Sequence, residues 1–205
     1  MEARGDQSDS SPRIPVQFGL PGIAASVYSH AEIPPLMHGN NWTGQNVSDW
    51  WCSEKFHGWR AYWTGERLVS RLGMVYQAPV WFTMTLPFFP LDCELWLGRG
   101  FTADDVHKAI AAGEWSRLRL AVFDCPGMKI EEAIATIRAT RFPSNAIAAE
   151  FWQVKSAEGA RLAMLQVVAN GGEGVMLRKP RSMYRNIRTS DLLKLTPAQI
   201  NRGPL

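Results

Sequence analysis

The chain has 205 residues, of which 46% are hydrophobic and 20% are charged, so it can bury a substantial core as one large domain. Its formal net charge is only +3, which permits nucleic acid as a partner but does not argue for one without local clustering of charge. Its three cysteines, Cys52, Cys93 and Cys125, lack the spacing of a zinc site and fit small buried residues in a reducing compartment. No apolar run approaches the ~20 residues of a membrane span, and the polar N-terminus does not resemble a signal peptide. We therefore expect a cytoplasmic protein that does not contact a membrane.

The N-terminal part of the chain offers few signals for regular structure. Residues 1–13 are rich in Ser, Asp and Gly and predict a disordered tail. Residues 14–36 contain four prolines, which favour extended chain lying over a surface rather than a helix. Residues 40–46 have the composition of a loop.

The rest of the chain mixes short strands with helices. Residues 59–63 and 68–71 predict a hairpin around the turn Thr64-Gly65. Thr102 is a predicted helix N-cap, with acidic residues in the first turn and Gly113 as the stop. The links resemble hairpins more than regular βαβ units, so the pattern favours an α+β fold with mainly antiparallel sheets and flanking helices. The other expected helices cover residues 131–140 and the stretch from Ser156 toward Gly171, and the other expected strands cover 91–97, 118–123, 148–154, 174–178 and 192–195.

The stretch from Glu54 to Arg60 places a lysine and an arginine five residues apart, on either side of a glycine. Gly58 would let a backbone or a phosphate come close. A lysine amine attacks only when it is deprotonated, so burial or nearby cations must favour its neutral form. Arg60 could provide that positive charge and could also hold the phosphates of a nucleotide. Lys55 is therefore a candidate nucleophile, although these residues alone also fit a solvated surface hairpin.

Polar residues interrupt the apolar strands at five places along the chain. A charged residue among Leu, Val and Met is costly to bury unless it is paired or bound to something. Two carboxylates, Glu94 and Glu173, and three cations, Lys55, Arg60 and Lys194, are therefore candidates for one polar pocket, in which Phe123 could provide a face for a planar ring.

These stretches resemble a set of motifs that occurs in one enzyme family. Glu54 to Arg60 resembles the motif K-x-D-G-x-R, and Ser70 to Gly73 resembles the R-x-G that follows it. Leu91 to Trp96 resembles D-G-E-L-W, and Val122 to Asp124 resembles the F-D strand. Glu173 to Arg178 resembles E-G-V-M-L-R, and Leu192 to Leu195 resembles most of L-L-K-x-K. In this order they are similar to the nucleotidyltransferase motifs of ATP-dependent DNA ligases, a superfamily that also includes RNA ligases and mRNA capping enzymes. The resemblance covers roughly residues 35 to 197 and comes nearest to the small ligases of bacteria and phages.

The resemblance implies that residues 14–205 form one nucleotidyltransferase domain that works in three steps. Lys55 would attack the α-phosphate of ATP, the AMP would pass to a 5′-phosphate at a nick, and the 3′-hydroxyl would displace it. The implied cofactors are ATP and Mg²⁺, with Mn²⁺ as an alternative metal. The implied partner is nicked duplex DNA, in repair, replication or recombination, and the protein is expected to be a cytoplasmic monomer in a bacterial or phage-infected cell.

The resemblance also implies a role for each motif residue. Glu94 and Glu173 would bind the metal, since Mg²⁺ prefers hard oxygen ligands. Phe123 would stack on adenine, Lys194 would contact the α-phosphate, and Arg71 would hold the 5′-phosphate of the nick. The implied ATP-binding set is Ser53, Glu54, Arg60, Glu94, Phe123, Glu173, Val175 and Lys194, and the implied nucleic-acid-binding set is Arg71, Arg178 and Arg188.

Four positions depart from the family pattern. His57 stands where the family has an Asp, and Cys93 stands where it has a Gly. Thr196 stands where the family has a Lys, and Ile187 stands where many relatives have a Gly. The sequence also ends at Leu205, soon after the last motif, so we expect no OB-fold domain in this chain and consider a protein partner as the source of a clamp. Two alternatives stay open: an RNA ligase, a class in which K-x-H-G also occurs, and a pseudo-ligase that binds nucleotide or nucleic acid without catalysis.

Overall fold

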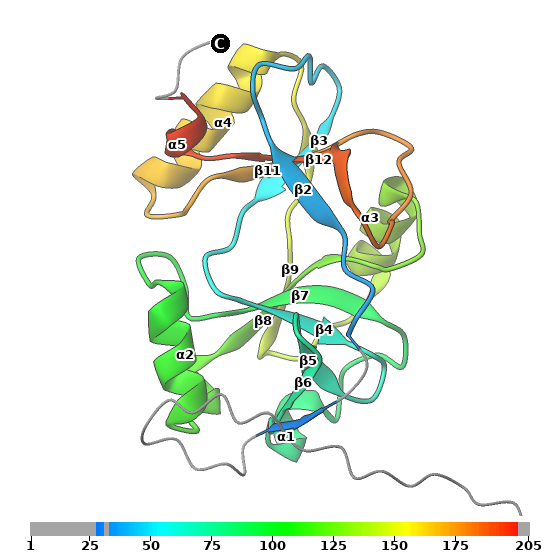
Figure 1. Ribbon diagram of the computed structural model, residues 1–205, viewed down its shortest axis with the longest axis vertical. Coiled ribbons are helices and arrows are strands. Elements are labelled where there is room, and N and C mark those ends of the chain that lie inside the picture. Colours follow the sequence, from blue (N-terminus) through cyan, green and yellow to red (C-terminus); the bar gives the residue numbers. More distant parts are fainter. Residues whose placement is uncertain (1–27, 31–32, 201–205) are drawn as a thin grey trace, which may run out of the picture.

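The computed structural model describes residues 28–30 and 33–200. The predicted tail over residues 1–13 lies outside the described residues. The described chain forms two β-sheets, one above the other in Figure 1, with helices beside them.

The larger sheet has seven strands in the order β1-β6-β5-β4-β7-β8-β9. Neighbouring strands are antiparallel except β8 and β9, which are parallel. The strands are β1 (Tyr28–His30), β4 (Trp59–Trp63), β5 (Leu68–Ser70), β6 (Met74–Tyr76), β7 (Leu91–Trp96), β8 (Arg119–Asp124) and β9 (Ala146–Ala148).

The smaller sheet has five strands in the order β10-β3-β11-β12-β2. Here β12 and β2 are the parallel pair, and the other neighbours are antiparallel. The strands are β2 (His38–Asn41), β3 (Trp51–Glu54), β10 (Trp152–Gln153), β11 (Val175–Arg178) and β12 (Arg188–Leu195).

The three longer helices each pack against one or two strands of a sheet. Helix α2 (Ala103–Ala111) contacts β4 and β7, α3 (Ile130–Ala139) contacts β8, and α4 (Ala157–Ala169) contacts β11. Thr102 forms a capping box with Asp105, which satisfies backbone N–H groups at the start of α2. Two short helices, α1 (Val80–Thr83) and α5 (Pro197–Ile200), and a 3₁₀ turn (Trp115–Arg117) complete the described chain.

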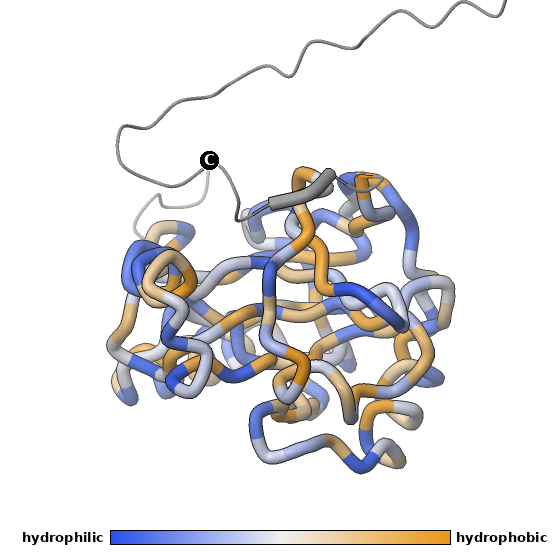
Figure 2. The backbone as a smooth tube through the Cα atoms, turned by 90° about the horizontal axis from the view of Figure 1, so that it is seen from below, coloured by the Kyte–Doolittle hydropathy of each residue, from blue (hydrophilic) through white to orange (hydrophobic). Residues whose placement is uncertain are grey.

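Each sheet has its own hydrophobic core. In the larger sheet Leu91, Leu95 and Leu120 are fully buried, and in the smaller sheet Cys52 and Leu177 are fully buried. Hydrophobic and hydrophilic stretches alternate along the chain, as expected for strands that turn only one face to a core (Figure 2). Because the two cores are separate, the space between the sheets is free to be lined by polar side chains.

The α+β prediction with mainly antiparallel sheets and flanking helices is confirmed. The hairpin around Thr64-Gly65 is also confirmed, because β4 pairs with β5 and Gly65 adopts a φ of 102°. The single strand predicted over residues 148–154 is wrong: β9 ends at Ala148 in the larger sheet, and β10 begins at Trp152 in the smaller one. Among the described residues, no helix combines the length and the apolar character that a bilayer crossing requires.

Candidate active site

Lys55 lies where the chain crosses from one sheet to the other. Strand β3 ends at Glu54 in the smaller sheet, and β4 begins at Trp59 in the larger one (Figure 1). The Lys55 backbone N–H donates to the Gly174 carbonyl oxygen at 2.8 Å, so the lysine is fixed just beyond the end of β3. The motif lysine is thereby held by backbone contacts at the junction of the two sheets.

Gly58 is required at this crossing because the backbone of β7 passes close by. A Cβ atom at position 58 would lie 2.0 Å from the Leu95 carbonyl oxygen and 2.9 Å from Cγ of Glu94. The Gly58 N–H also donates a hydrogen bond to the Glu94 carboxyl group. The glycine of the lysine motif therefore serves close packing, and it links the lysine segment to Glu94.

A pocket of about 720 Å³ opens between the sheets, which is a suitable size for a nucleotide. Strands of both sheets line it. Ten of the predicted site residues are among its lining: Ser53, Glu54, Lys55, Arg60, Arg71, Glu94, Phe123, Arg178, Arg188 and Lys194. The structure thus brings together residues that are up to about 140 positions apart in the sequence.

Val175 differs from the expectation that it lines the ATP site. It is fully buried in the core of the smaller sheet, and its neighbour Met176 lines the pocket instead. Successive side chains of a strand point to opposite faces, so only one of the two can face the pocket. The structure therefore places Met176, and not the predicted Val175, in the pocket lining.

Glu173 is the ion-pair partner of Lys55. Its Oε2 lies 2.5 Å from Nζ of Lys55, and both side chains are about one quarter exposed. Gly174, which follows, has a φ of 151°, and a Cβ atom there would lie 2.5 Å from the Leu195 carbonyl oxygen. The E-G pair of this motif therefore combines a carboxylate beside Lys55 with a glycine that lets β11 approach β12.

Glu94 is the second carboxyl group near Lys55. Burial raises its pKa to about 8, and the positive charges of Lys55 and Arg60 offset part of that rise. The protonated, uncharged form of Glu94 is therefore favoured at neutral pH, and a cation bound beside it would favour the ionised form. The described residues contain no group of three or more His, Cys, Asp and Glu side chains that could hold a metal, so Glu94 and Glu173 stand as a pair of oxygen ligands.

A buried ionic cluster forms one wall of the pocket. Arg60 donates to both oxygens of Asp92, Nε at 2.9 Å from Oδ1 and Nη2 to Oδ2, and Nη2 also donates to the Met37 carbonyl oxygen at 2.8 Å. Tyr184 donates its hydroxyl to Asp92 Oδ2 at 2.6 Å. The Arg60 guanidinium lies 5.6 Å from the centre of the Phe123 ring. Arg60 is thus held rigidly next to the aromatic ring predicted to stack on a base.

Sequence reasoning missed the roles of Asp92 and Tyr184. Asp92 was part of a quoted motif, and its position inside an apolar strand was a signal that it would be buried with a cation. Tyr184 lies in a polar connection between β11 and β12 and carried no comparable signal.

Arg178 does not fit the prediction that it binds nucleic acid. Its side chain is 4% exposed and forms an ion pair with Asp124, Nη1 to Oδ2 at 2.9 Å, while Nε donates to the Ser182 hydroxyl. Burial raises the pKa of Asp124 to about 7, and the positive charge of Arg178 opposes that rise. The pair joins β8 of the larger sheet to β11 of the smaller one, so the charge of Arg178 is paired with Asp124 inside the protein.

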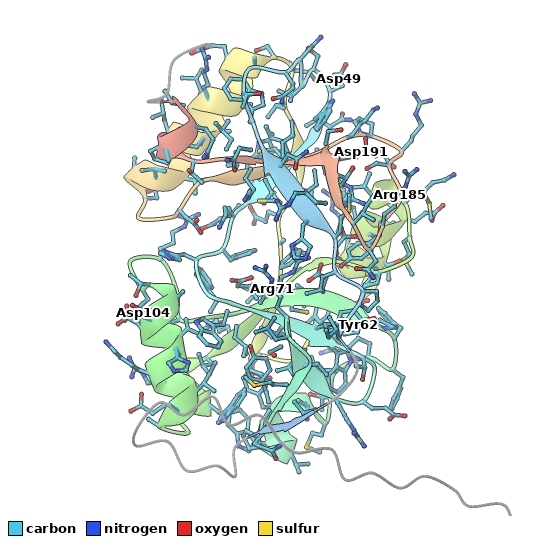
Figure 3. All side chains as sticks on the ribbon, in the orientation of Figure 1. Asp49, Tyr62, Arg71, Asp104, Arg185 and Asp191 are labelled. Atoms are coloured by element: carbon cyan, nitrogen blue, oxygen red, sulfur yellow. The ribbon has the colours of Figure 1, made fainter. Side chains whose placement is uncertain are left out.

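Three other cations line the pocket. Arg188 donates from Nη1 to the Gly39 carbonyl oxygen at 2.7 Å, and Arg71 lies between the two sheets (Figure 3). Burial, together with Arg188 and Lys55, lowers the pKa of Lys194. The pocket therefore concentrates positive charge, as a site for phosphates would.

The four departures from the motif pattern lie outside the pocket lining. Cys93 is fully buried in the core of the larger sheet, and His57 and Ile187 are exposed. Thr196 precedes α5, and its hydroxyl and backbone N–H both donate to Oε1 of Gln199. None of the four present side chains lines the described pocket, and Thr196 lies against Gly174.

Two mainly antiparallel sheets thus bring a motif lysine, two carboxylates and several cations together, as the resemblance to nucleotidyltransferases implied. No family model matches the chain. A DNA ligase of Haemophilus influenzae is 32% identical over 171 residues, which cover 80% of this chain and 64% of that protein.

Solved structures of DNA ligases have the same fold. A Lig E DNA ligase matches with a TM-score of 0.70 and 27% identity, covering 78% of this chain and 68% of the other. The DNA ligase–adenylate of Chlorella virus matches with a TM-score of 0.67 and 19% identity over 80% of this chain and 67% of the other. The ATP-dependent DNA ligase of bacteriophage T7, solved with ATP, matches with a TM-score of 0.60 and 15% identity over 82% of this chain and 70% of the other. By sequence the chain is similar to a DNA ligase, and it has the fold of the matched part of the solved DNA ligases.

Proposed function

We propose that the chain is the catalytic domain of an ATP-dependent DNA ligase, with Lys55 as the residue that accepts AMP. The observation that carries the proposal is the position of Lys55: it lies at the crossing between the sheets, 2.5 Å from the carboxylate of Glu173, in a pocket rich in cations. The chain spans 64% of the length of the Haemophilus DNA ligase, so the activity of a whole ligase is part of the proposal.

The reaction would proceed by three displacements at phosphorus. Nζ of Lys55 attacks the α-phosphate of ATP, a P–N bond forms, and pyrophosphate leaves. The 5′-phosphate of the nick then displaces Lys55 and forms a pyrophosphate linkage with AMP. The 3′-hydroxyl finally attacks the 5′-phosphate, which forms the phosphodiester bond and releases AMP. Such transfers depend mainly on positioning and on charge neutralisation, which a pocket lined by several cations would supply.

The nucleotide would occupy the pocket between the sheets. Phe123 would stack on the adenine, beside the guanidinium of Arg60. The backbone of Ser53 and Glu54, at the end of β3, would contact the edge of the base. Lys194 would lie near the α-phosphate, where burial and then the positive charges of Arg188 and Lys55 lower the pKa of its amine.

The two carboxylates near Lys55 fit a magnesium ion. Mg²⁺ commonly takes one or two carboxylates and keeps the rest of its shell for waters and substrate phosphates, so the lack of a third protein ligand among the described residues does not conflict with it. Glu94 and Glu173 would hold the ion, with Mn²⁺ as an alternative. When bound, the ion would neutralise charge on the phosphates.

The 5′ end of the DNA strand at the nick would enter at the outer side of the pocket, where Arg71 and Arg188 lie. Both side chains line the pocket and both residues are exposed, so they can reach a ligand from solvent. We infer that they contact the 5′-phosphate side of the nick in duplex DNA. Monomeric action in the cytoplasm is part of the same proposal.

Neither alternative function has support from the site. His57, which suggested an RNA ligase, is exposed and does not line the pocket. The departures that suggested a pseudo-ligase leave the described pocket with its lysine, carboxylates and cations. We therefore favour catalysis on DNA.

Sealing of a labelled nick tests the proposal. The purified chain is incubated with ATP, Mg²⁺ and a duplex that carries one nick with a labelled 5′-phosphate, and in parallel with the same nick in RNA. Sealing of DNA that Lys55→Ala abolishes supports the proposal, and Lys155→Ala is the matched control because Lys155 pairs with Asp49 at the surface. Sealing of RNA alone, or no step of the reaction with either substrate, would contradict it.

A further inference from the structure

His38 is held beside Arg188 by the pairing of two strands. Strand β2 runs parallel to β12, and His38 lies opposite Arg188 in the register. The His38 backbone N–H donates to the Ile187 carbonyl oxygen at 3.0 Å, and Arg188 donates to the carbonyl oxygen of Gly39 at 2.7 Å. The backbone thus fixes the position of His38 relative to an arginine at the mouth of the pocket.

The charges around His38 are mostly positive. It lines the pocket together with Arg60, Arg71 and Arg188. The charge of Arg60 is compensated by Asp92, its ion-pair partner. Within the described part of the chain, Arg71 and Arg188 form no ion pair with a carboxylate, so their charge is available to an anionic ligand.

Burial and these charges favour the neutral form of the imidazole. Burial is the largest cause that lowers the pKa of His38 below its ordinary value of 6.5, followed by Arg60, Arg71 and Arg188, while Asp92 acts in the opposite direction. An anion that neutralises the arginines would remove part of this effect. The imidazole could then take up a proton and donate a charge-assisted hydrogen bond.

We propose that His38, with Arg71 and Arg188, forms a binding site for a terminal phosphate monoester and donates a hydrogen bond to it. The proposal rests on the proposed function, which identifies the monoester as the 5′-phosphate at a nick. A terminal monoester carries close to two negative charges near neutral pH, whereas an internal diester carries one. Two arginines and a histidine that gains a proton match the higher charge, so His38 favours a phosphorylated end over continuous backbone.

Titration of His38 tests the proposal directly. The resonances of labelled histidines are followed by NMR against pH, and loss of one signal in His38→Gln assigns that residue. In the free protein the pKa of His38 lies below 6.5. With a nicked duplex bearing a 5′-phosphate it rises by about one unit or more, and with the matched 5′-hydroxyl nick it does not. His57 is the internal control, since it is exposed and does not line the pocket.

Binding of the two nicks supplies a second readout that a purely structural role would not move. The ratio of affinities for the 5′-phosphate and 5′-hydroxyl nicks falls about tenfold in His38→Gln, in line with loss of one hydrogen bond to a charged group. In the parent protein the ratio also declines as pH rises through the pKa of bound His38, and in His38→Gln this component is lost. His57→Gln behaves like the parent in both respects.

The outcomes separate this inference from the proposed function. If Lys55 gains AMP but the pKa of His38 does not respond to the 5′-phosphate, the inference about His38 is overturned while the ligase assignment stands. If the pKa of His38 responds but Lys55 gains no AMP, the phosphate site stands and the ligase assignment fails. An equal response to both nicks overturns the claim of monoester recognition.

Discussion

Gly58→Ala perturbs the packing that connects the lysine segment to β7. The added Cβ would lie 2.0 Å from the carbonyl oxygen of Leu95, whereas ordinary contacts begin near 3.4 Å, so the two backbones must separate by more than an ångström. The obstacle is backbone rather than the end of a flexible side chain, and overpacking of this kind costs about 1–3 kcal/mol. For a chain of this size, about 2 kcal/mol corresponds to a fall in Tm of roughly 4–8 °C.

The same displacement would reach the reacting groups. Gly58 lies three residues from Lys55, and its N–H donates to the carboxyl group of Glu94. A misplacement of about 1 Å can slow a reaction by about a hundredfold. We therefore expect Gly58→Ala to slow formation of the covalent AMP adduct by about that factor, measured by single-turnover labelling with ATP.

Gly159→Ala is the matched control for this substitution. Gly159 lies in the first turn of α4, and a Cβ atom there would meet only the Ser156 hydroxyl, at an ordinary 3.5 Å. Alanine favours a helix over glycine by up to about 1 kcal/mol, so this variant should be as stable as the parent or slightly more stable. An adenylation rate and a Tm of Gly58→Ala equal to those of the parent would refute the close-packing explanation of the motif glycine.

Four further predictions concern charged groups of the site. Glu173→Gln should slow adenylation at least tenfold in single-turnover labelling, because it removes the carboxylate paired with Lys55, and an unchanged rate would contradict that role. Asp92→Asn should lower the free energy of unfolding by about 3 kcal/mol in urea titrations, because it leaves Arg60 without its counter-charge, whereas the exposed Asp49→Asn should change it by less than about 1 kcal/mol. The Mg²⁺ concentration for half-maximal adenylation should fall as pH rises toward 8, because the Glu94 carboxyl group must lose its proton to bind the ion, and Glu94→Gln should lose this dependence. A Mg²⁺ requirement that does not depend on pH would count against the assignment of Glu94 as a metal ligand. Because folding raises the pKa of Glu94 from 4.5 to about 8, the contribution of Glu94 to stability should also decline as pH rises between these values.

Local signals in the sequence predicted local structure well. The Thr64-Gly65 turn and the Thr102 cap each depend on a few neighbouring residues, and both elements form as expected. The division of the strands between two sheets could not be predicted in this way. Strands β3 and β4 are only four residues apart, and β9 and β10 only three, yet each pair is split between the sheets because their hydrogen-bond partners come from distant parts of the chain.

The site was predictable where a motif residue also interrupts an apolar strand. Lys55, Glu94 and Phe123 belong to motif stretches that contain such residues, and all three line the pocket. The sequence motifs could not show which charged side chains form ion pairs inside the protein. Arg178 was therefore expected at a nucleic-acid surface although it pairs with Asp124. His38 carried no motif at all, and only the pairing of β2 with β12 shows that it lies next to Arg188.

Identification of the residue that becomes adenylated tests the central claim most directly. The chain is incubated with ATP and Mg²⁺, digested, and analysed by mass spectrometry for a peptide that carries AMP. We predict one adduct, on Nζ of Lys55, that is absent from Lys55→Ala and retained in Lys155→Ala. An adduct on Lys194 or Lys179 instead, or no adduct under any divalent metal, would contradict the assignment of Lys55 as the nucleophile of a DNA ligase.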